Sequence, residues 1–480
     1  MIGLLPALLP ALGALLAPLP AVRTRAVALL GLVAAADAAL ALALAFGSPP
    51  DVAVSLGGGW FTLDATSRLF LLVIDLVFLG VAAYLWTRVR DTPGFREGIE
   101  RLVALALAFM AAATLAILSA HLVAAWALLE VTTLVAVPMI QHRGSAARLR
   151  ASWTYFLFST IGLALAALGL ACIARGLEEG GAAPGLFLDA LAGVARRPPG
   201  TWARLGIALV LLGYGTKLGL APMYTWLPET YHAGPPAVTV LLAAVQFNVA
   251  LVALLRVLQV FGPAGQGIAG PVLVTLGLAT MAASALGIVV TRNYTRLIAH
   301  AALTHGGVIA IGLGVGPAAA YGVVLYAVSN AFIKSILFLT AGKIEAHYGT
   351  EDVREVSGLL QDMPYSGLFF TVGTFALLGL PPFGSFLGEL VIMSGLFATA
   401  RYAVFAAFGA VLTVTFVATG RAVFPMIWGE PRRRVDWASQ PLPALLPKLF
   451  FLACLVAMGI YLPAPVSELF RRVAASVGGG

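Results

Sequence analysis

Charged side chains are scarce in this chain. Asp, Glu, Lys and Arg make up only 10% of its 480 residues, whereas 60% are hydrophobic and the mean hydropathy is +0.97. A soluble domain carries about 25% charged residues. This shortage excludes a globular surface solvated by water alone and indicates a chain that lies mostly in lipid.

Cysteine is also rare, and the motifs that bind cofactors are missing. The two cysteines, Cys172 and Cys454, each lie in an apolar run, and no CxxC or Cys/His metal spacing occurs. That pattern argues against iron–sulfur clusters and structural zinc. No glycine-rich phosphate loop stands between a strand and a helix. We therefore expect no metal, no nucleotide site and no redox cofactor on this chain.

The basic residues do not form a surface for nucleic acid. The net charge is +8, but the Lys and Arg residues are spread over many short loops, without an aromatic stripe. Such a distribution is typical of loops that face the cytoplasm. The sequence therefore predicts a lipid bilayer, and no nucleic acid, as the surroundings of this chain.

Apolar runs long enough to cross a bilayer recur along the whole chain. Because a bilayer core needs about 20 apolar residues per helix, the sequence predicts an all-α polytopic protein with about fourteen transmembrane helices. The predicted helices are 2–20, 26–46, 67–87, 101–119, 121–140, 152–175, 203–223, 235–261, 270–291, 296–316, 318–341, 366–393, 399–428 and 447–463.

Lys and Arg are distributed unequally between the two sets of loops. The richer set includes Arg23, Arg88, Arg148 and residues 432–434. By the positive-inside rule this set faces the cytoplasm. An even number of helices then places both termini on the periplasmic side of a bacterial or archaeal cytoplasmic membrane.

Prolines interrupt the seventh and twelfth predicted helices in similar ways. The seventh contains KLGLAP at 217–222, and the twelfth contains LLGLPP at 377–382. Proline inside a membrane helix frees backbone groups, which is tolerated where they are buried in protein or line a wet cavity. Two broken helices in corresponding positions predict two inverted five-helix repeats with ion sites at the breaks.

This pattern divides the chain into four parts. Three N-terminal helices occupy 1–100, the first repeat 101–261 and the second repeat 270–428. A loop, the last helix and a tail occupy 429–480.

Several ionisable residues fall deep in the predicted helices. Each costs about 2.5–3.5 kcal/mol at the middle of a membrane and needs an explanation. The deep residues are Glu130, Lys217, His300, His305, Lys334 and Glu389. Burial disfavours the charged forms of Lys and Glu, and histidine titrates near neutral pH, so such groups suit proton transfer. The alternative is that they only pair and lock helices together.

Several long motifs resemble one family. WALLEVTTLVAVPMI, KLGLAPMYTWLPETYHAGPPAVTV, NAFIKSILFLTAGKI and GLPPFGSFLGELVI occur in order. They resemble the antiporter-like membrane subunits of respiratory complex I, Mrp sodium/proton antiporters and group 4 hydrogenases. The similarity is greatest to the hydrogenase-4 / formate hydrogenlyase F-type subunit, followed by the complex I ND4-like subunit.

The resemblance implies roles for particular positions. Glu130 and Lys217 take the places of the glutamate and lysine whose interaction drives proton transfer. Lys334, with His305 near it, and Glu389 take the positions of the second half. The resemblance also implies partners, namely other membrane subunits and a soluble redox arm on separate chains.

Three positions depart from the family pattern. Asn248 stands where many complex I subunits have a lysine, and His232 lies one residue after the usual histidine position. His300 replaces the first residue of a Tyr-Ser-Ser run. Because Asn cannot titrate, we expect His300 and His305 to form the central relay, with Asn248, His232 and Thr216 as supporting polar residues.

The sequence therefore predicts a proton-translocating, non-redox subunit of a redox-driven complex. A Mrp-like sodium/proton antiporter, an ND4-like subunit of NADH:quinone oxidoreductase, a subunit that energises inorganic-carbon uptake and an inactive scaffold remain alternatives.

Overall fold

A computed structural model gives the fold and describes residues 2–47, 54–91, 96–179, 185–194, 199–431 and 442–478. Residues 432–434, used above for orientation, lie outside the described residues. The described chain is almost wholly helical, as the sequence predicts. A short antiparallel hairpin of β1 (Val54–Leu56) and β2 (Phe61–Leu63) was not predicted.

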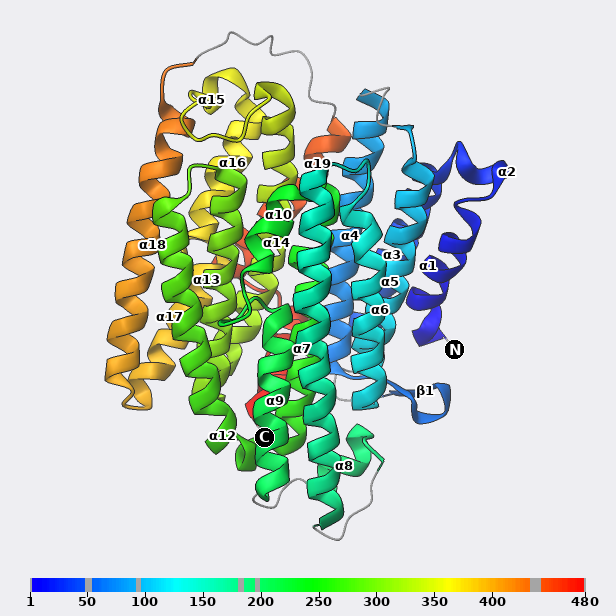
Figure 1. The fold of residues 1–480 in the computed structure, drawn as a ribbon, viewed down its shortest axis with the longest axis vertical. Helices are drawn as coiled ribbons and strands as arrows, with labels where there is room; N and C mark the ends of the chain where they lie inside the picture. Colours follow the sequence, from blue (N-terminus) through cyan, green and yellow to red (C-terminus); the bar gives the residue numbers. More distant parts are fainter. Residues whose placement is uncertain are drawn as a thin grey trace.

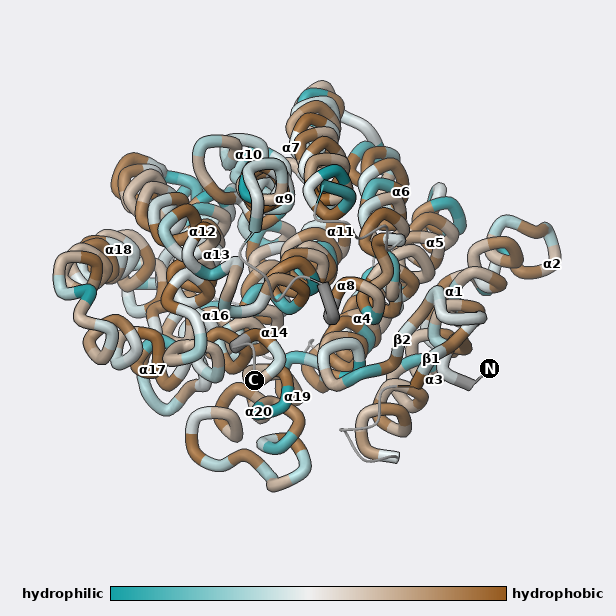
Figure 2. Tube along the Cα trace, turned by 90° about the horizontal axis from the view of Figure 1, so that it is seen from below, coloured by the Kyte–Doolittle hydropathy of each residue, from teal (hydrophilic) through white to brown (hydrophobic). Residues whose placement is uncertain are grey.

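The N-terminal helices lie at one end of the bundle. Figure 2 shows α1 and α3 on the side of the molecule opposite α17 and α18. This part comprises η1 (Ile2–Leu4), α1 (Leu5–Leu16), α2 (Pro20–Arg23), α3 (Ala26–Phe46), η2 (Gly57–Gly59) within the hairpin, and α4 (Ala65–Asp91).

The middle of the chain contains the first broken helix and a π-helix. Its elements are α5 (Ile99–Leu118), α6 (Leu122–Ile140), α7 (Ala146–Glu179), α8 (Leu188–Val194), α9 (Thr201–Lys217), α10 (Trp226–Ala233), α11 (Pro236–Val240), the π-helix η4 (Leu241–Gln246) and α12 (Phe247–Val290).

The last part contains the second broken helix. Its elements are α13 (Tyr294–Val315), α14 (Pro317–Tyr348), α15 (Leu359–Asp362), α16 (Pro364–Leu377), α17 (Gly384–Ala398), α18 (Tyr402–Trp428), α19 (Leu442–Ile460) and α20 (Ala464–Gly478).

The helical run of α12 folds back on itself at Gly262. That residue has φ 45° and ψ −140°, a conformation that favours glycine. Contacts on the two sides of Gly262 show that the chain reverses its direction there. Gln259, before it, bonds Thr66 near the hairpin, whereas Gly287, well after it, packs against His300 near the opposite face. The two predicted helices 235–261 and 270–291 are therefore separate legs of this run.

The predicted total of fourteen spans remains a prediction. Among the described residues, nine helical runs are long and apolar enough to cross a membrane by themselves, or ten with a bent pair. That count takes 236–290 as one run although it folds back, and it leaves out the short pieces of both broken helices.

Helices α12 and α14 form the centre of the bundle. The most apolar stretch of each is buried completely, whereas only 22% of the corresponding stretch of α18 is buried. A helix that is apolar all round is stable only where neighbours or lipid surround it. Lys334 of α14 is fully buried and is therefore enclosed by protein.

The segment after the last predicted span is helical. Helix α20 bends away from α19 by 75°. Leu469, Phe470 and Val473 are buried, while Glu468 and Arg472 pair with each other on the other side. This amphipathic pattern packs α20 against α14, α12 and α4.

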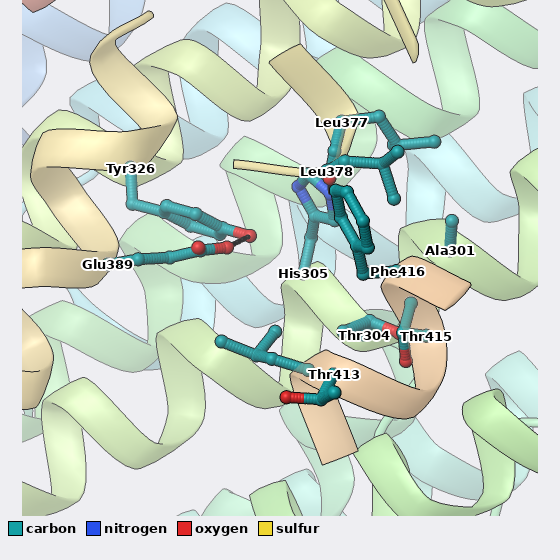
Figure 3. A pocket seen from close by; sticks show the side chains of 11 residues that line it. Ala301, Thr304, His305, Tyr326, Leu377, Leu378, Glu389, Thr413, Thr415 and Phe416 are labelled. Atoms are coloured by element: carbon teal, nitrogen blue, oxygen red, sulfur yellow. Dashed lines mark hydrogen bonds between the residues drawn. The ribbon is translucent and has the colours of Figure 1, made fainter. Parts of the chain in front are cut away.

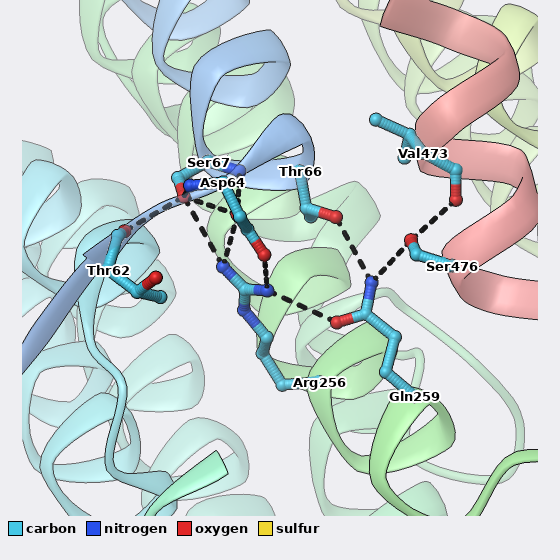
Figure 4. Close-up of polar contacts among 8 residues, drawn as sticks. All are labelled: Thr62, Asp64, Thr66, Ser67, Arg256, Gln259, Val473 and Ser476. Atoms are coloured by element: carbon cyan, nitrogen blue, oxygen red, sulfur yellow. Dashed lines mark hydrogen bonds and ion pairs between the residues drawn. The ribbon is translucent and has the colours of Figure 1, made fainter. Parts of the chain in front are cut away.

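A polar network joins α4, α12 and α20 near the hairpin (Figure 4). Asp64 and Ser67 cap the start of α4 reciprocally, each accepting a backbone N–H from the other residue. The Arg256 guanidinium donates to the Asp64 carboxylate at 2.9 Å. Gln259 donates to Thr66 at 3.0 Å and to Ser476 of α20 at 2.9 Å.

Replacing Arg256 with Gln is expected to lower the free energy of unfolding by about 2–4 kcal/mol, because Asp64 loses its charge partner in a largely buried site. Thermal and denaturant unfolding in detergent measure this loss. Arg421→Gln removes an exposed arginine of α18 and is the control. Equal losses in the two variants would contradict the proposed importance of the ion pair.

The same pair makes stability depend on pH. Burial alone would raise the pKa of Asp64, but the charge and hydrogen bonds of Arg256 and Ser67 outweigh it and hold that pKa well below its usual value. A carboxyl with a lowered folded pKa stabilises the fold above its ordinary pKa, and this stabilisation disappears as the pH falls. Asp64→Asn should remove this part of the acid sensitivity below about pH 4.

Candidate functional site

The first break separates α9 from α10 immediately after Lys217. Gly219 has φ 74°, and a Cβ atom there would lie 2.7 Å from Leu227 and from Leu303. A glycine is therefore required for the chain to turn at this point. The break ends α9 in the interior, so the Lys217 side chain lies there with 2% exposure.

Lys217 is held by two hydroxyl groups from neighbouring helices. Its Nζ atom donates to Thr133 Oγ1 of α6 at 2.7 Å and to the Tyr155 hydroxyl of α7 at 3.2 Å. The same atom lies 4.6 Å from the centre of the Tyr155 ring. These contacts offset part of the cost of burying an ammonium group.

A chain of hydrogen bonds extends from Lys217 into the bundle. The Tyr155 hydroxyl donates to Gln246 Oε1 at 2.7 Å, and Gln246 Nε2 donates to Thr132 Oγ1 at 3.1 Å. Gln246 ends the π-helix η4, and π-helices occur frequently at functional sites. The sequence did not predict this π-helix.

Glu130 does not contact Lys217 directly. Its carboxylate accepts a hydrogen bond from Thr160 at 3.1 Å, and its Oε2 atom is buried without a hydrogen-bond partner among the described residues. The charges of Glu130 and Lys217 nevertheless interact electrostatically. Thr133, one turn after Glu130 on α6, contacts Lys217 and thus connects the two ends of the predicted pair.

The second break repeats the geometry of the first. In both, three successive backbone N–H groups bond carbonyls of the preceding helix in the same pattern, from Leu218 to Leu220 and from Leu378 to Leu380. Gly379 has φ 63°, as Gly219 has a positive φ. Figure 1 shows α10 above α9 but α17 below α16, so the broken helices run in opposite directions, as inverted repeats predict.

Glu389 of α17 lies against the second break. Its carboxylate contacts the position where a Cβ atom of residue 379 would be, so only glycine permits this approach. The Tyr326 hydroxyl of α14 donates to Glu389 Oε1 at 3.0 Å. Figure 3 shows the two side chains directed toward one another in a cavity of about 220 Å³.

His305 of α13 lies in the same cavity. Its Nε2 atom is 3.1 Å from the carbonyl oxygen of Leu377, which ends α16, and its ring lies 5.1 Å from the Tyr326 ring. Lys334 of α14 interacts electrostatically with His305. His305, Lys334, Tyr326 and Glu389 therefore form a second cluster.

An aromatic ring stands between the two clusters. The Nζ atom of Lys334 is fully buried, has no hydrogen-bond partner in the described part of the chain and lies 4.0 Å from the centre of the Phe247 ring. Phe247 follows Gln246, a member of the first network. The next residue, Asn248, donates to the Ala244 carbonyl at 2.6 Å and leaves its Oδ1 atom unpaired within the same residues. Direct hydrogen bonds thus do not join the two clusters among the described residues.

His300 is directed elsewhere. It lines an open cleft of about 530 Å³ together with Arg296, Glu229 and Asp352. This cleft lies near the face that carries the arginine-rich set of loops, hereafter called the arginine-rich face. Arg296 and Glu229 form an ion pair at 3.0 Å across this cleft. The structure does not bring His300 next to His305, and a relay that uses both histidines stays a prediction.

The two remaining supporting residues have local partners. His232 Nδ1 lies 2.7 Å from Glu351 Oε2 at the arginine-rich face. The Thr216 hydroxyl donates to the Leu212 carbonyl, and the Thr216 carbonyl accepts from Trp226 Nε1 at 3.0 Å. Thr216 thus stabilises the break itself.

Comparison with known families identifies the chain. Residues 119–414 match the model of the transmembrane family "NADH:quinone oxidoreductase/Mrp antiporter". The chain belongs to this family. It is an antiporter-like membrane subunit of the type shared by complex I, Mrp and hydrogenase-4 complexes, and both broken helices fall within the matched residues.

Curated relatives agree with this assignment. The chain of this antiporter-like subunit is 32% identical over 366 residues to a hydrogenase-4 component F homolog of Methylacidiphilum infernorum, covering 75% of each chain. It is 26% identical to a subunit of the Na⁺/H⁺ antiporter of Bacillus subtilis, covering 72% of this chain and 70% of that one.

Solved structures share the fold. A chain of the archaeal membrane-bound sulfane sulfur reductase superposes with a TM-score of 0.87 at 22% identity, covering 99% of this chain and 97% of that one. A chain of Thermus thermophilus complex I superposes with a TM-score of 0.82 at 24% identity and covers both chains completely. The predicted all-α, multi-pass membrane fold is confirmed.

The antiporter-like subunit has a buried carboxylate pair that sequence analysis missed. Asp37 of α3 and Asp75 of α4 are both 0% exposed, and none of their carboxylate oxygens has a hydrogen-bond partner among the residues that the structure describes. The two groups interact electrostatically. Each interrupts an apolar run, which was the signal available in the sequence. Tyr155 and Tyr326 were also missed, because a tyrosine in an apolar helix gives no indication of its hydroxyl's partner.

We expect Tyr155→Phe to reduce the rate of ion translocation about tenfold, because the change removes the hydroxyl that joins Lys217 to Gln246. A tenfold loss corresponds to a rise of about 1.4 kcal/mol in the activation free energy, which is the size expected for one lost hydrogen bond. Proton uptake by inverted vesicles containing the assembled complex measures the effect. Tyr214→Phe, at a buried tyrosine of α9 outside this network, is the control. Equal rates for Tyr155→Phe and the unaltered protein would contradict a role for the hydroxyl.

Proposed function

We propose that this antiporter-like subunit moves protons across a bacterial or archaeal cytoplasmic membrane as the non-redox part of a redox-driven complex. The observation that carries the proposal is the pair of buried clusters, each located at a helix break. Intramembrane ionisable groups are costly and usually functional. Polar groups at the breaks of inverted repeats are typical of ion sites.

The first cluster would load and release a proton at Lys217. Thr133 and Tyr155 hold its amine, and the Glu130 charge stabilises the protonated form. A shift of Glu130 away from Lys217 would weaken that stabilisation and release the proton. The Tyr155–Gln246 hydrogen bonds provide a direction for its transfer into the bundle.

The second cluster would receive the proton and pass it to the opposite face. Within the described residues, the amine of Lys334 has an aromatic ring rather than a hydrogen-bond partner beside it, so its charged form is poorly compensated. His305 and Glu389 share a cavity near it and can each hold a proton. Glu389 at the second break is then the group from which the proton leaves.

We also propose that the redox chemistry takes place on other chains. The relatives of this chain include a hydrogenase-4 component F homolog, and the solved structures with the same fold come from multi-subunit respiratory complexes. Partner membrane subunits and a soluble redox arm would drive the proton movement.

The termini support one orientation. Gly3 packs against Leu56 of the β1–β2 hairpin, and Ser476 is joined through Gln259 to Thr66, just after that hairpin. Both ends of the described chain therefore lie near one face, opposite the arginine-rich loops. By the positive-inside rule we assign that face to the periplasm.

A Mrp-like sodium/proton antiporter is the second candidate, favoured by the similarity to the Na⁺/H⁺ antiporter of Bacillus subtilis. Flux through the purified chain in liposomes, without an electron donor, would support it. Identification of the co-purifying subunits separates the remaining alternatives. A nickel–iron large subunit, a quinone-reducing arm or neither would distinguish hydrogenase-type, complex I-type and carbon-uptake complexes.

Lys217→Met should abolish proton translocation by the assembled complex while electron transfer by its soluble arm continues. Methionine has a similar shape but cannot bind a proton. Vesicle acidification driven by the native electron donor is the measurement. The matched control is Lys448→Met, at a buried lysine of α19 outside both clusters. Normal pumping by a fully assembled Lys217→Met complex would favour the inactive scaffold.

The two histidines of α13 are tested by His300→Gln, His305→Gln and the double variant. If both act in series on one path, the double variant should pump at about the rate of the slower single variant, because the slowest step limits a series. Losses of flux that add, with each substitution removing its own share, would indicate separate routes and remove His300 from the relay.

A further inference from the structure

A cleft opens between α5 and α6 at the arginine-rich face, away from both clusters. Its volume is about 410 Å³, and it lies between the first turn of α5 and the last turn of α6. Arg101, Gln141, His142 and Arg143 contribute the polar lining together with Glu97. Leu105 and Pro138 form its apolar part.

Cationic side chains outnumber carboxylates in the lining of this cleft, with Arg101 and Arg143 against Glu97. Burial first, and then the charges of Arg143 and Arg148, lower the pKa of His142 to about 4; Glu100 opposes this shift, and Arg101 adds a smaller lowering effect. His142 is therefore a neutral group surrounded by three cationic ones at neutral pH. Glu100 is paired with Arg23 at 2.8 Å, which reduces its effect on the cleft.

Two details of the backbone also fit an anionic ligand. Arg143 has φ 59°, a left-handed conformation that non-glycine residues rarely adopt, although Gly144 is its neighbour. Non-glycine residues in this conformation cluster at active sites, ligand-binding sites and switch regions. In the described part of the chain, no side chain caps the start of α5, where Gly98 lines the cleft.

An apolar stripe leads from the cleft toward the middle of the membrane. On α6, Leu134 is 52% exposed and Val131 is 42% exposed, and both precede Pro138 at helical spacing. On α5, the half-buried Leu105 and Ala108 follow Arg101 in the same direction. These helices are antiparallel neighbours, so the two stripes run side by side.

We propose that this cleft binds the headgroup of an anionic phospholipid, with its acyl chains along the stripes of α5 and α6. Arg101 and Arg143 would contact the phosphate, and the Gln141 amide and neutral His142 would bond the rest of the headgroup. Basic pockets between membrane helices on the cytoplasmic side bind anionic lipids. This inference is independent of the proposed ion path.

The test uses the full-length chain, purified in mild detergent and transferred to phosphatidylcholine nanodiscs that contain increasing phosphatidylglycerol. Native mass spectrometry counts the phosphatidylglycerol molecules that remain bound to the chain after it is released from the nanodiscs. We expect the unaltered chain to retain one preferentially. The double variant Arg101→Gln/Arg143→Gln should bind phosphatidylglycerol about thirtyfold more weakly. At 1.4 kcal/mol per tenfold change in affinity, this is a loss of about 2 kcal/mol in binding free energy.

Matched variants keep the result interpretable. Arg150→Gln removes an exposed arginine at the start of α7 that does not line the cleft and should bind like the unaltered chain. Arg101→Lys/Arg143→Lys keeps both charges and should retain most of the binding, which separates loss of charge from loss of folding. Equal binding by the Gln double variant and the unaltered chain would overturn the proposal.

Two further outcomes would also overturn it. Displacement of the lipid by about 20 mM inorganic phosphate would show a site for a free anion. Loss of the lipid in the assembled complex, with retention by the isolated chain, would show that a neighbouring subunit occupies the cleft instead.

Discussion

The cost of holding an ionisable side chain away from water is the constraint on which this structure depends. A bilayer offers such groups no hydrogen-bond partners, so protein must provide them. Lys217 receives two hydroxyl groups, and Glu389 receives one from Tyr326. Lys334 receives an aromatic ring in place of a hydroxyl. The hydrogen bonds that offset the cost of burial thus differ between Lys217, Glu389 and Lys334. Groups that are stabilised unequally can exchange a charge more readily than groups that are all held equally.

The helix breaks satisfy the same constraint at the level of the backbone. Each ends a helix in the middle of the bundle and rebinds the freed N–H groups in one shared pattern. Gly219 and Gly379 permit the left-handed turn that this pattern needs. The two breaks run in opposite directions, and each lies beside one of the two polar clusters.

Between the two clusters, the proposed path has no continuous hydrogen bonds among the described residues. Phe247 stands beside Lys334, and the Asn248 amide nitrogen donates to a carbonyl of the preceding turn. A proton that passes between the halves requires water or a side-chain movement at this point, because neither Phe247 nor Asn248 titrates. The cleft at His300 and the cavity at His305 are separate and have no lining residue in common.

The sequence by itself determined what lipid and local backbone chemistry control. Apolar length located the helices, Gly and Pro located both breaks, and the cost of buried charge selected Lys217, Lys334 and Glu389. Only the tertiary structure decided which groups meet, because that depends on how each helix is rotated and packed. It joined Lys217 to Tyr155 and Tyr155 to Gln246 of the π-helix, and it separated His300 from His305. It also brought Asp37 near Asp75 and packed α20 against the bundle. No local pattern specifies such contacts, since each requires partners distant in the chain.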